Sequence, residues 1–291
     1  MLKRRLVRAG LFGNGLILII ASVNGTNHKH AAGTVIKVST DPAVRQLAAF
    51  DSSFSVVSEL PEAAIADIPR IRLNPHAEKF VKDYNVRNTE ALEQVRARGD
   101  QYFPLMDSIF QVYHLPAELK YLAAIESELK STAISRVGAA GPWQLMTQTA
   151  RDLRLKIRGQ YDERRSYCKS TVAAAKYLRD LYAQFGDWLL VIAAYNSGPG
   201  KVLSAMKASG SHNFWALQSY LPAETRGHVK RFIATHYYFE GYGSVTTLTK
   251  SETITYRKAV SEFIEKQRQD VARDVAGEML TGPNARDLAK R

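Results

Sequence analysis

The sequence predicts an all-α protein, and three observations support this prediction. Apolar residues recur at helical spacing from about residue 76 onward, and helix caps and glycine stops bound these segments. The sequence shows no strand-period alternation of weight, no internal repeat and no low-complexity tract. Of the 291 residues, 45% are hydrophobic and 23% are charged, as in ordinary globular proteins, which excludes wholesale disorder and collagen-like or coiled-coil architectures.

The first 25 residues are typical of a secretory signal. Four basic residues and no acidic residue lead into a mostly apolar run from Ala9 to Val23, which ends in small and polar residues. The run is shorter than the roughly 20 apolar residues of a membrane span, and Gly13 and Gly15 interrupt it. We therefore expect an exported protein of the periplasm or cell envelope. The alternative is an uncleaved anchor that gives peripheral membrane association.

Residues 26–75 form the least regular part of the sequence. Proline interrupts it at Asp41-Pro42, Leu60-Pro61, Ile68-Pro69 and Asn74-Pro75. A residue that precedes proline is pushed away from helical geometry. We therefore expect an extended leader that wraps the main domain.

Helices are predicted in order after this leader. Asn88 caps a helix that we expect to end at Gly99, and Pro104 begins another. Pro116 opens a helix over 116–129 that has an apolar stripe on one face. Three further helices have cap or stop residues: 171–185 between Ser170 and Gly186, 188–195 after Asp187, and Pro222 through Phe239 before Gly241. The 188–195 helix is almost wholly apolar, so it should lie in the core.

Glu126 is the first candidate for chemistry. It stands near the end of the 116–129 helix, on the side of its apolar stripe, and a polar loop follows. A desolvated position on an apolar helix face favours a carboxylic acid that keeps its proton at neutral pH, as a general acid must. The alternative is a solvent-facing glutamate.

The loop at 135–146 is the second feature. Gly138 and Gly141 flank two alanines and allow close backbone approach to a ligand or to another helix. Trp143 and Gln144 follow with an aromatic face and an amide, which are the usual groups of a sugar site. The alternative for the glycines and alanines is tight helix packing.

Two more segments stand out. The apolar 188–195 helix delivers Tyr195 and Asn196 at its end and breaks at Gly198, which is also explained by a simple helix stop. The segment lacks the Gly-Lys-Ser/Thr of a phosphate-binding loop. The other segment, 221–228, opens the last long helix and contains Glu224 and His228, for which the alternative is a helix-surface histidine.

Together these motifs resemble the transglycosylase SLT domain family. The matching segments occur in one order: Glu126-Ser127, then Ser135-Arg136-Val137-Gly138-Ala139-Ala140-Gly141-Pro142-Trp143-Gln144-Leu145-Met146, then Ala194-Tyr195-Asn196-Ser197-Gly198-Pro199-Gly200, then Leu221-Pro222-Ala223-Glu224-Thr225-Arg226. The resemblance covers about residues 68–245. Ordered motifs over about 100 residues are far more specific than a lone glycine-rich loop.

The resemblance implies a lysozyme-like (goose-type/SLT) helical domain. It implies cleavage of the β-1,4 bond between N-acetylmuramic acid and N-acetylglucosamine in peptidoglycan without water, which leaves a 1,6-anhydromuramyl end. Glu126 would be the catalytic residue. The substrate-binding positions would be Ser127, Ser135, Gly138, Trp143, Gln144, Met146, Tyr195, Asn196, Gly198, Glu224 and His228. No cofactor is implied.

The chain departs from the family at two places. The family often has a tyrosine where this chain has His228, so His228, Tyr237 or Tyr238 could take that part. The LysM peptidoglycan-binding repeat that is often attached to members of this family is not recognisable, because residues 250–291 are too short and too charged for one. The expected organisation is a signal at 1–25, an extended N-terminal segment at 26–85, the SLT domain at 86–245 and a charged, helical C-terminal tail at 246–291.

Two other functions use the same fold. A peptidoglycan-hydrolysing muramidase needs two carboxylates, and no acidic residue lies between Glu128 and Asp152, although Asp162 could serve. A non-catalytic peptidoglycan-binding protein would keep the fold without the chemistry. In both cases peptidoglycan glycan strands are the partner, and we expect a monomer.

Metal and nucleic-acid readings have little support. The single cysteine, Cys168, rules out an internal disulfide or a multi-cysteine metal site, and His228 and His236 are eight residues apart rather than four, so we expect no metal. The net charge of +12 invites a nucleic-acid reading, but a third of it lies in the first eight residues. Residues 100–249 carry only +5, which suits attraction to an anionic wall polymer, so we expect no nucleic-acid partner.

Overall fold

The structure is a computed structural model that describes residues 68–281, and the predicted signal and most of the predicted leader lie outside them. The all-α prediction is confirmed. In chain order the elements are α3 (Pro75–Arg87), α4 (Thr89–Val112), the 3₁₀ turn η2 (Ala117–Lys120), α5 (Tyr121–Ser127), α6 (Thr147–Asp152), β1 (Ile157–Arg158), β2 (Tyr161–Asp162), η3 (Glu163–Arg165), α7 (Tyr167–Phe185), α8 (Trp188–Ser197), α9 (Pro199–Ser209), α10 (Phe214–Leu217), η4 (Gln218–Tyr220), α11 (Ala223–Glu240), η5 (Val245–Thr247) and α12 (Lys250–Thr281).

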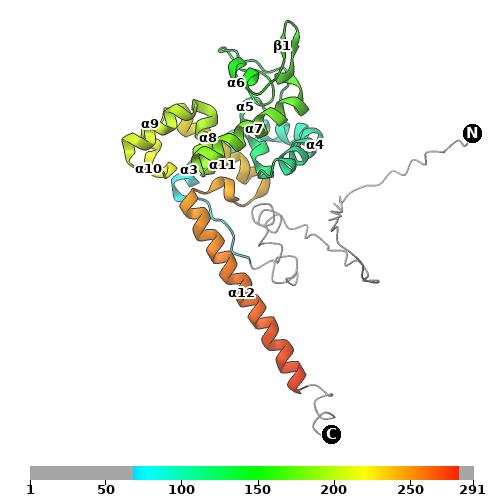
Figure 1. Ribbon diagram of the computed structural model, residues 1–291, viewed down its shortest axis with the longest axis vertical. Coiled ribbons are helices and arrows are strands. Elements are labelled where there is room, and N and C mark those ends of the chain that lie inside the picture. Colours follow the sequence, from blue (N-terminus) through cyan, green and yellow to red (C-terminus); the bar gives the residue numbers. More distant parts are fainter. Residues whose placement is uncertain (1–67, 282–291) are drawn as a thin grey trace, which may run out of the picture.

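A small antiparallel hairpin is the one sheet within residues 68–281. It pairs Ile157 with Asp162 and Arg158 with Tyr161. Strands of two residues are too short to show an alternating pattern, which is why the sequence did not predict them. The hairpin lies at the end of the molecule opposite α12 (Figure 1).

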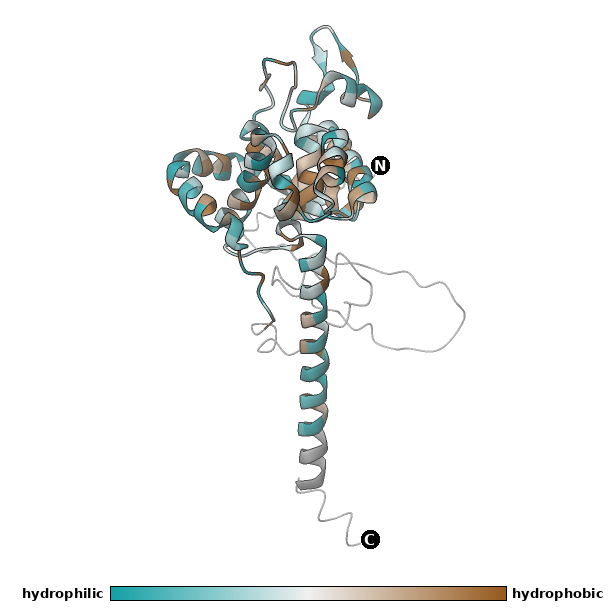
Figure 2. Ribbon diagram, turned by 90° about the vertical axis from the view of Figure 1, so that its left-hand side faces the viewer, coloured by the Kyte–Doolittle hydropathy of each residue, from teal (hydrophilic) through white to brown (hydrophobic). Residues whose placement is uncertain are grey.

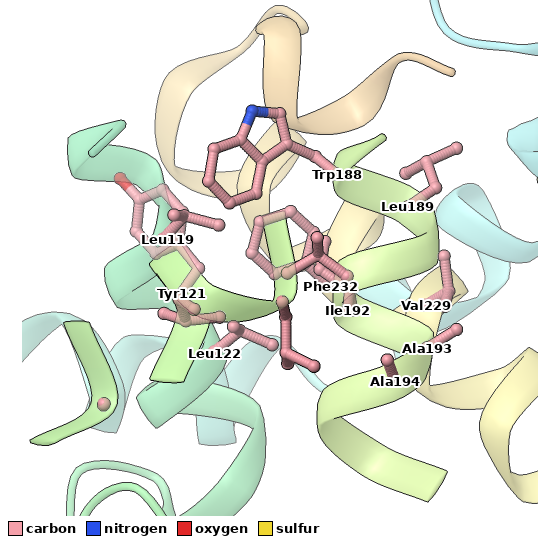
Figure 3. Close-up of a cluster of buried hydrophobic side chains, with 14 of the residues drawn as sticks. Leu119, Tyr121, Leu122, Trp188, Leu189, Ile192, Ala193, Ala194, Val229 and Phe232 are labelled. Carbon is pink, nitrogen blue, oxygen red and sulfur yellow. The ribbon is translucent and has the colours of Figure 1, made fainter. Parts of the chain in front are cut away.

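Helix α8 forms the centre of the core, as its apolar sequence predicted. Every residue from Trp188 to Ala194 is buried, and α8 packs against α7, α9 and α11. Figure 3 shows Trp188 and Ile192 beside Phe232 of α11. Full burial of one such large apolar side chain contributes about 1.5–3 kcal/mol. The helix that carries the Tyr195–Gly198 motif is therefore anchored along most of its length.

The Asp187 cap and the Gly186 and Gly241 stops predicted for the later helices are confirmed. The Asp187 side chain accepts hydrogen bonds from the N–H groups of Leu189 and Leu190 at 2.9 and 3.1 Å. Gly186 ends α7 and Gly241 ends α11, both in the left-handed conformation that costs glycine least. The sequence thus located the C-terminal ends of these helices to within about two residues.

The prediction of separate helices before and after Pro104 is wrong. Helix α4 runs unbroken from Thr89 to Val112 with Pro104 inside it. Gly99 does not end the helix but lies buried inside it. A Cβ at this position would lie 2.3 Å from the ring of Phe103, so close packing explains the glycine. A buried stripe that includes Val95 and Met106 on the two sides of the proline holds the helix together. Burial of this stripe offsets the roughly 3 kcal/mol that an internal proline costs.

Two other helix boundaries differ from the prediction. Ser166, not Ser170, caps α7, and the Ser170 hydroxyl instead donates to the Ser166 carbonyl at 2.6 Å inside the helix. The segment predicted as one helix over 116–129 begins as the 3₁₀ turn η2 and continues as α5, which ends at Ser127. Glu128 and Leu129 follow with φ of 54° and 63°. The chain therefore turns sharply just after Glu126.

Helix α12 extends away from the helical body (Figures 1 and 2). Its predicted helical character is confirmed. Helix α3 crosses the expected boundary between residues 85 and 86 and packs against α11 of the main domain. The expected division at residues 25, 85 and 245 stays a prediction. Among residues 68–281, no helix is long and apolar enough to cross a membrane.

Candidate active site

Glu126 and His228 meet although 102 residues separate them. Glu126 stands in the last turn of α5, and His228 stands in the second turn of α11. His228 Nε2 lies 2.9 Å from Glu126 Oε1, and the two side chains are 2% and 16% exposed, respectively. The alternative of a helix-surface histidine is therefore excluded. Packing of α11 on both α5 and α8 buries the ring.

The end of α5 is fixed on the side opposite the solvent. The Ser127 hydroxyl hydrogen-bonds the carbonyls of Ala123 and Pro142 at 3.2 and 2.8 Å. Ser127 is buried, so its hydroxyl holds the 135–146 loop against α5 and is not free for a substrate. Glu128 pairs instead with Arg98 and Lys130 at 3.2 and 2.6 Å.

The 135–146 loop is held by its own polar side chains. Ser135 Oγ accepts a hydrogen bond from the Ala139 N–H at 3.0 Å. The Gln144 amide donates to the carbonyls of Gly141 and Ala133 at 2.9 and 3.3 Å. Gln144 itself has a φ of 44°. The side chains of Ser135 and Gln144, both predicted to contact substrate, therefore form hydrogen bonds within the loop. The Gln144 amide oxygen is left for other contacts.

Arg164 supports this loop from behind and was missed by the sequence reading. Its guanidinium donates to the Gly138 and Leu145 carbonyls at 2.7 and 3.0 Å. It also binds the Asp162 carboxylate through Nε and Nη2 at 3.0 and 2.7 Å, and this hydrogen bonding lowers the pKa of Asp162. Gly141 lies against the same residue, since a Cβ there would be 1.9 Å from the Arg164 carbonyl oxygen. Nothing in the local sequence distinguishes Arg164 from its exposed neighbour Arg165.

The expectation that Trp143 offers an aromatic face to a sugar is wrong. Its side chain is fully buried, and its indole N–H donates to the Thr171 hydroxyl at 2.9 Å. The ring packs edge-on against Phe110. Trp143 instead joins the loop to the core, and Met146 is the exposed apolar residue at the end of this loop, at 45%.

Tyr195 and Asn196 lie between these parts. The Tyr195 hydroxyl donates to the Trp143 carbonyl at 2.7 Å. Burial, and then the nearby Glu126 charge, raise the pKa of Tyr195, so its hydroxyl stays a donor. The Asn196 side-chain oxygen accepts a hydrogen bond from the Thr225 hydroxyl at 2.9 Å, which joins α8 to the start of α11. Gly198 ends α8 with a φ of 84° and caps α9.

A cavity of about 480 Å³ opens beside this junction. It is lined by Gly200, Lys201, Ser204, Tyr220, Leu221 and Pro222. These residues belong to the starts of α9 and α11 and to the turn before α11. The exposed carboxylate of Glu224 stands in the next turn of the chain, while Thr225 is buried. The structure therefore brings Glu126 together with His228 and near Tyr195, joins Asn196 to Thr225 of the same helix as His228, and leaves Met146 and Glu224 on the surface.

Part of the chain matches the model of a known family. Residues 110–218 match the transglycosylase SLT domain. The matched segment includes Glu126, the 135–146 loop and the Tyr195–Gly198 segment, while His228 lies ten residues past its end.

The relatives of known name share part of their length with this chain. The chain is 37% identical to membrane-bound lytic murein transglycosylase D of Escherichia coli K12 over 158 residues. The aligned region covers 53% of this chain and 34% of that protein. The chain is also 36% identical over 111 residues to a putative tributyltin chloride resistance protein of Alteromonas, covering 54% of that protein. The chain thus spans about a third of the length of the first relative.

Among solved structures, this chain is similar to the 70-kDa soluble lytic transglycosylase of Escherichia coli. The similarity covers 72% of this chain and 37% of that one, with 24% sequence identity and a TM-score of 0.45.

Proposed function

We propose that the SLT domain of this chain is a lytic transglycosylase that cleaves the β-1,4 bond between N-acetylmuramic acid and N-acetylglucosamine in peptidoglycan. One observation carries the proposal. Glu126 is a nearly buried carboxyl group at the end of an apolar helix, and its one recorded hydrogen-bond partner within residues 68–281 is a histidine. A single acid in such a position can both give and take a proton.

The reaction needs no second carboxylate. Glu126 gives its proton to the bridging oxygen while the bond from that oxygen to C1 of the muramyl residue breaks, and the N-acetylglucosamine leaves with a free 4-hydroxyl. The muramyl 6-hydroxyl oxygen then bonds to C1, and its proton goes to Glu126. The products are a 1,6-anhydromuramyl end and a restored acid. Atoms balance without water.

Hydrolysis on the same fold is less well supported. A hydrolase needs a second carboxylate beside the bond, to activate water or to form a covalent intermediate. Glu128 and Asp162 are the two acids that the sequence offers for this role, and both form ion pairs elsewhere. Glu128 pairs with Arg98 and Lys130, and Asp162 is bound by Arg164. Neither carboxylate faces Glu126 through a recorded contact. This favours transglycosylation over hydrolysis.

We further propose that the glycan strand passes over Glu126 towards the cavity at the start of α9. Asn196 would hydrogen-bond a sugar through its side-chain N–H groups, since its oxygen is taken by Thr225. Met146 would contact an apolar sugar face, and Gly138 and Gly198 would allow the strand close to the backbone. Lys201 and Glu224 would contact polar groups further along the strand.

A place in the cell envelope supports the same reaction. The relative from Escherichia coli is described as membrane-bound. We propose that the N-terminal signal exports this chain to the envelope, where peptidoglycan is found, and that it acts there as a monomer without a metal or cofactor.

Digestion of purified sacculi tests the proposal. Mass spectrometry of the released fragments should find anhydromuramyl ends, which are one water lighter than reducing ends. Glu126→Gln should abolish release, while Glu128→Gln, a change of a paired acid two residues away, should retain most of it. Reducing ends alone would show a hydrolase. Unchanged release by a folded Glu126→Gln variant would show that Glu126 is not the acid.

A further inference from the structure

His228 has one hydrogen-bond partner among the described residues, and that partner is Glu126. Its Nε2 lies 2.9 Å from Glu126 Oε1, while its Nδ1 is buried and has no partner within residues 68–281. We propose that His228 is a positioning residue: its Nε2–H holds Oε1 of Glu126 and leaves Oε2 as the oxygen that exchanges protons with the substrate. This inference rests on the proposed function.

The hydrogen bonds assign the proton of the neutral ring. A proton on Nδ1 would create a buried N–H without an acceptor, which is a rare defect in folded proteins. A doubly protonated ring would bury a positive charge and keep the same unpaired N–H. With the proton on Nε2, the donor is satisfied by Glu126 Oε1 and only a lone pair is left unpaired. His228 is therefore the donor in this contact.

This direction of donation separates the roles of the two carboxyl oxygens. Because Oε1 accepts from His228, the acidic proton belongs on Oε2, which points away from the ring contact. When Glu126 gives up its proton, the bond from Nε2–H becomes a bond to a charged acceptor and grows stronger. An interaction that strengthens as the reaction proceeds lowers the barrier rather than only binding substrate.

Within residues 68–281, the groups around Glu126 and His228 give the His228 ring no hydrogen-bond acceptor other than Glu126. Elements packed against α11 bring these titratable residues to its sides: Glu126 from α5, Tyr195 from α8 and Tyr84 from α3. On α11 itself, Glu224 precedes His228 by about one turn and is exposed, and Arg231 follows by just under one turn. The Tyr195 hydroxyl donates to the Trp143 carbonyl. Glu126 is therefore the hydrogen-bond partner that the described residues offer to the His228 ring.

Two amide variants separate hydrogen bonding from filling of space. A glutamine at 228 places an amide N–H at about the reach of Nε2, whereas an asparagine places it at about the reach of Nδ1. We expect His228→Gln to keep kcat within about tenfold of the parent and His228→Asn to lower kcat about 100-fold, with little change in KM. His228→Phe, which fills the space without a donor, should match His228→Asn.

The pH profile is the readout that a purely structural role would not move. Without the donor, the ionised form of the acid is less stabilised, so the alkaline limb of kcat should move to higher pH in the asparagine and phenylalanine variants and not in the glutamine variant. Release of anhydro ends from sacculi by the full chain gives the rates, and circular dichroism confirms folding. Where one of the donor-free variants does not fold, the other takes its place.

The outcomes distinguish this inference from the proposed function. Folded His228→Phe with the parent's kcat and pH profile would overturn the positioning role alone. Equal losses in the glutamine and phenylalanine variants, with unmoved pH profiles, would also overturn it and assign His228 to packing. A parent chain that releases no anhydro ends would overturn the proposed function and this inference with it.

Discussion

The Asp187 carboxylate accepts a hydrogen bond from the Lys250 backbone N–H at 2.6 Å, and thereby joins the start of α12 to the start of α8. The other oxygen of the same carboxylate accepts from the first turn of α8, at Leu189 and Leu190. The group is buried, which raises the pKa of Asp187 to about 6. One side chain thus fixes the origin of the projecting helix relative to the core.

Asp187→Asn should break this junction on one side only. The amide oxygen can keep the bonds to α8, but an amide N–H would face the Lys250 N–H. We expect a loss of about 1–3 kcal/mol in the free energy of unfolding, measured in urea, and faster hydrogen exchange in the first turn of α12. Asp180→Asn, which changes an exposed acid paired with Arg179, should cost less than about 1 kcal/mol. Equal losses in the two variants would contradict the junction.

Arg164→Lys should disorder the 135–146 loop while keeping the charge. Lysine cannot reproduce the planar set of donors that binds Asp162 and the two loop carbonyls. We expect a loss of about 2–3 kcal/mol in the free energy of unfolding and about tenfold or more in kcat/KM on sacculi. The exposed neighbour offers the control: Arg165→Lys should change neither value measurably. A fully active, stable Arg164→Lys protein would show that the loop holds itself.

Gly141→Ala and Gly138→Ala should differ although both glycines have positive φ. A Cβ at 141 would lie 1.9 Å from the Arg164 carbonyl oxygen, whereas a Cβ at 138 would meet nothing within 4 Å. We expect Gly138→Ala to cost about 1–2 kcal/mol from its backbone conformation alone. Gly141→Ala should cost about 3 kcal/mol or more, because the clash adds to the same backbone term. Equal thermal shifts would mean that the loop at 141 can move aside.

His236 should make the protein sensitive to acid. Burial lowers the pKa of His236 from 6.5 to about 3, so the folded protein keeps the ring neutral where the unfolded chain protonates it. Between these two pH values the unfolded state holds more protons, and stability therefore falls as the pH falls. The slope contributed is up to about 1.4 kcal/mol per pH unit.

Unfolding of His236→Gln and of the parent over this pH range isolates the effect. The stability difference between them should shrink as the pH falls, because only the parent loses the histidine term. His76→Gln, a change of an exposed histidine, controls for the loss of a histidine as such. A stability difference independent of pH would contradict the assignment.

The ends of the helices show which features the local sequence can predict and which it cannot. The Asp187 cap and the Gly186 and Gly241 stops act on neighbouring backbone groups, so they can be read without the fold. Pro104 and Gly99 gave the wrong answer because burial of a stripe along α4 outweighed their local preference. The prediction that Trp143 contacts a sugar failed for a related reason, because its hydrogen-bond partner, Thr171, lies 28 residues away in the sequence.

The sequence by itself determined the all-α class, the apolar core helix α8 and the order of the motifs, because periodicity and capping are local. The assignment of Glu126 as the acid stays a prediction that the sequence made first. Only the tertiary structure decided that the His228 ring contacts the Glu126 carboxyl group, that Arg164 supports the loop and that Trp143 is buried. Those relationships depend on how α5, α11 and η3 pack, and packing joins residues that no local pattern connects.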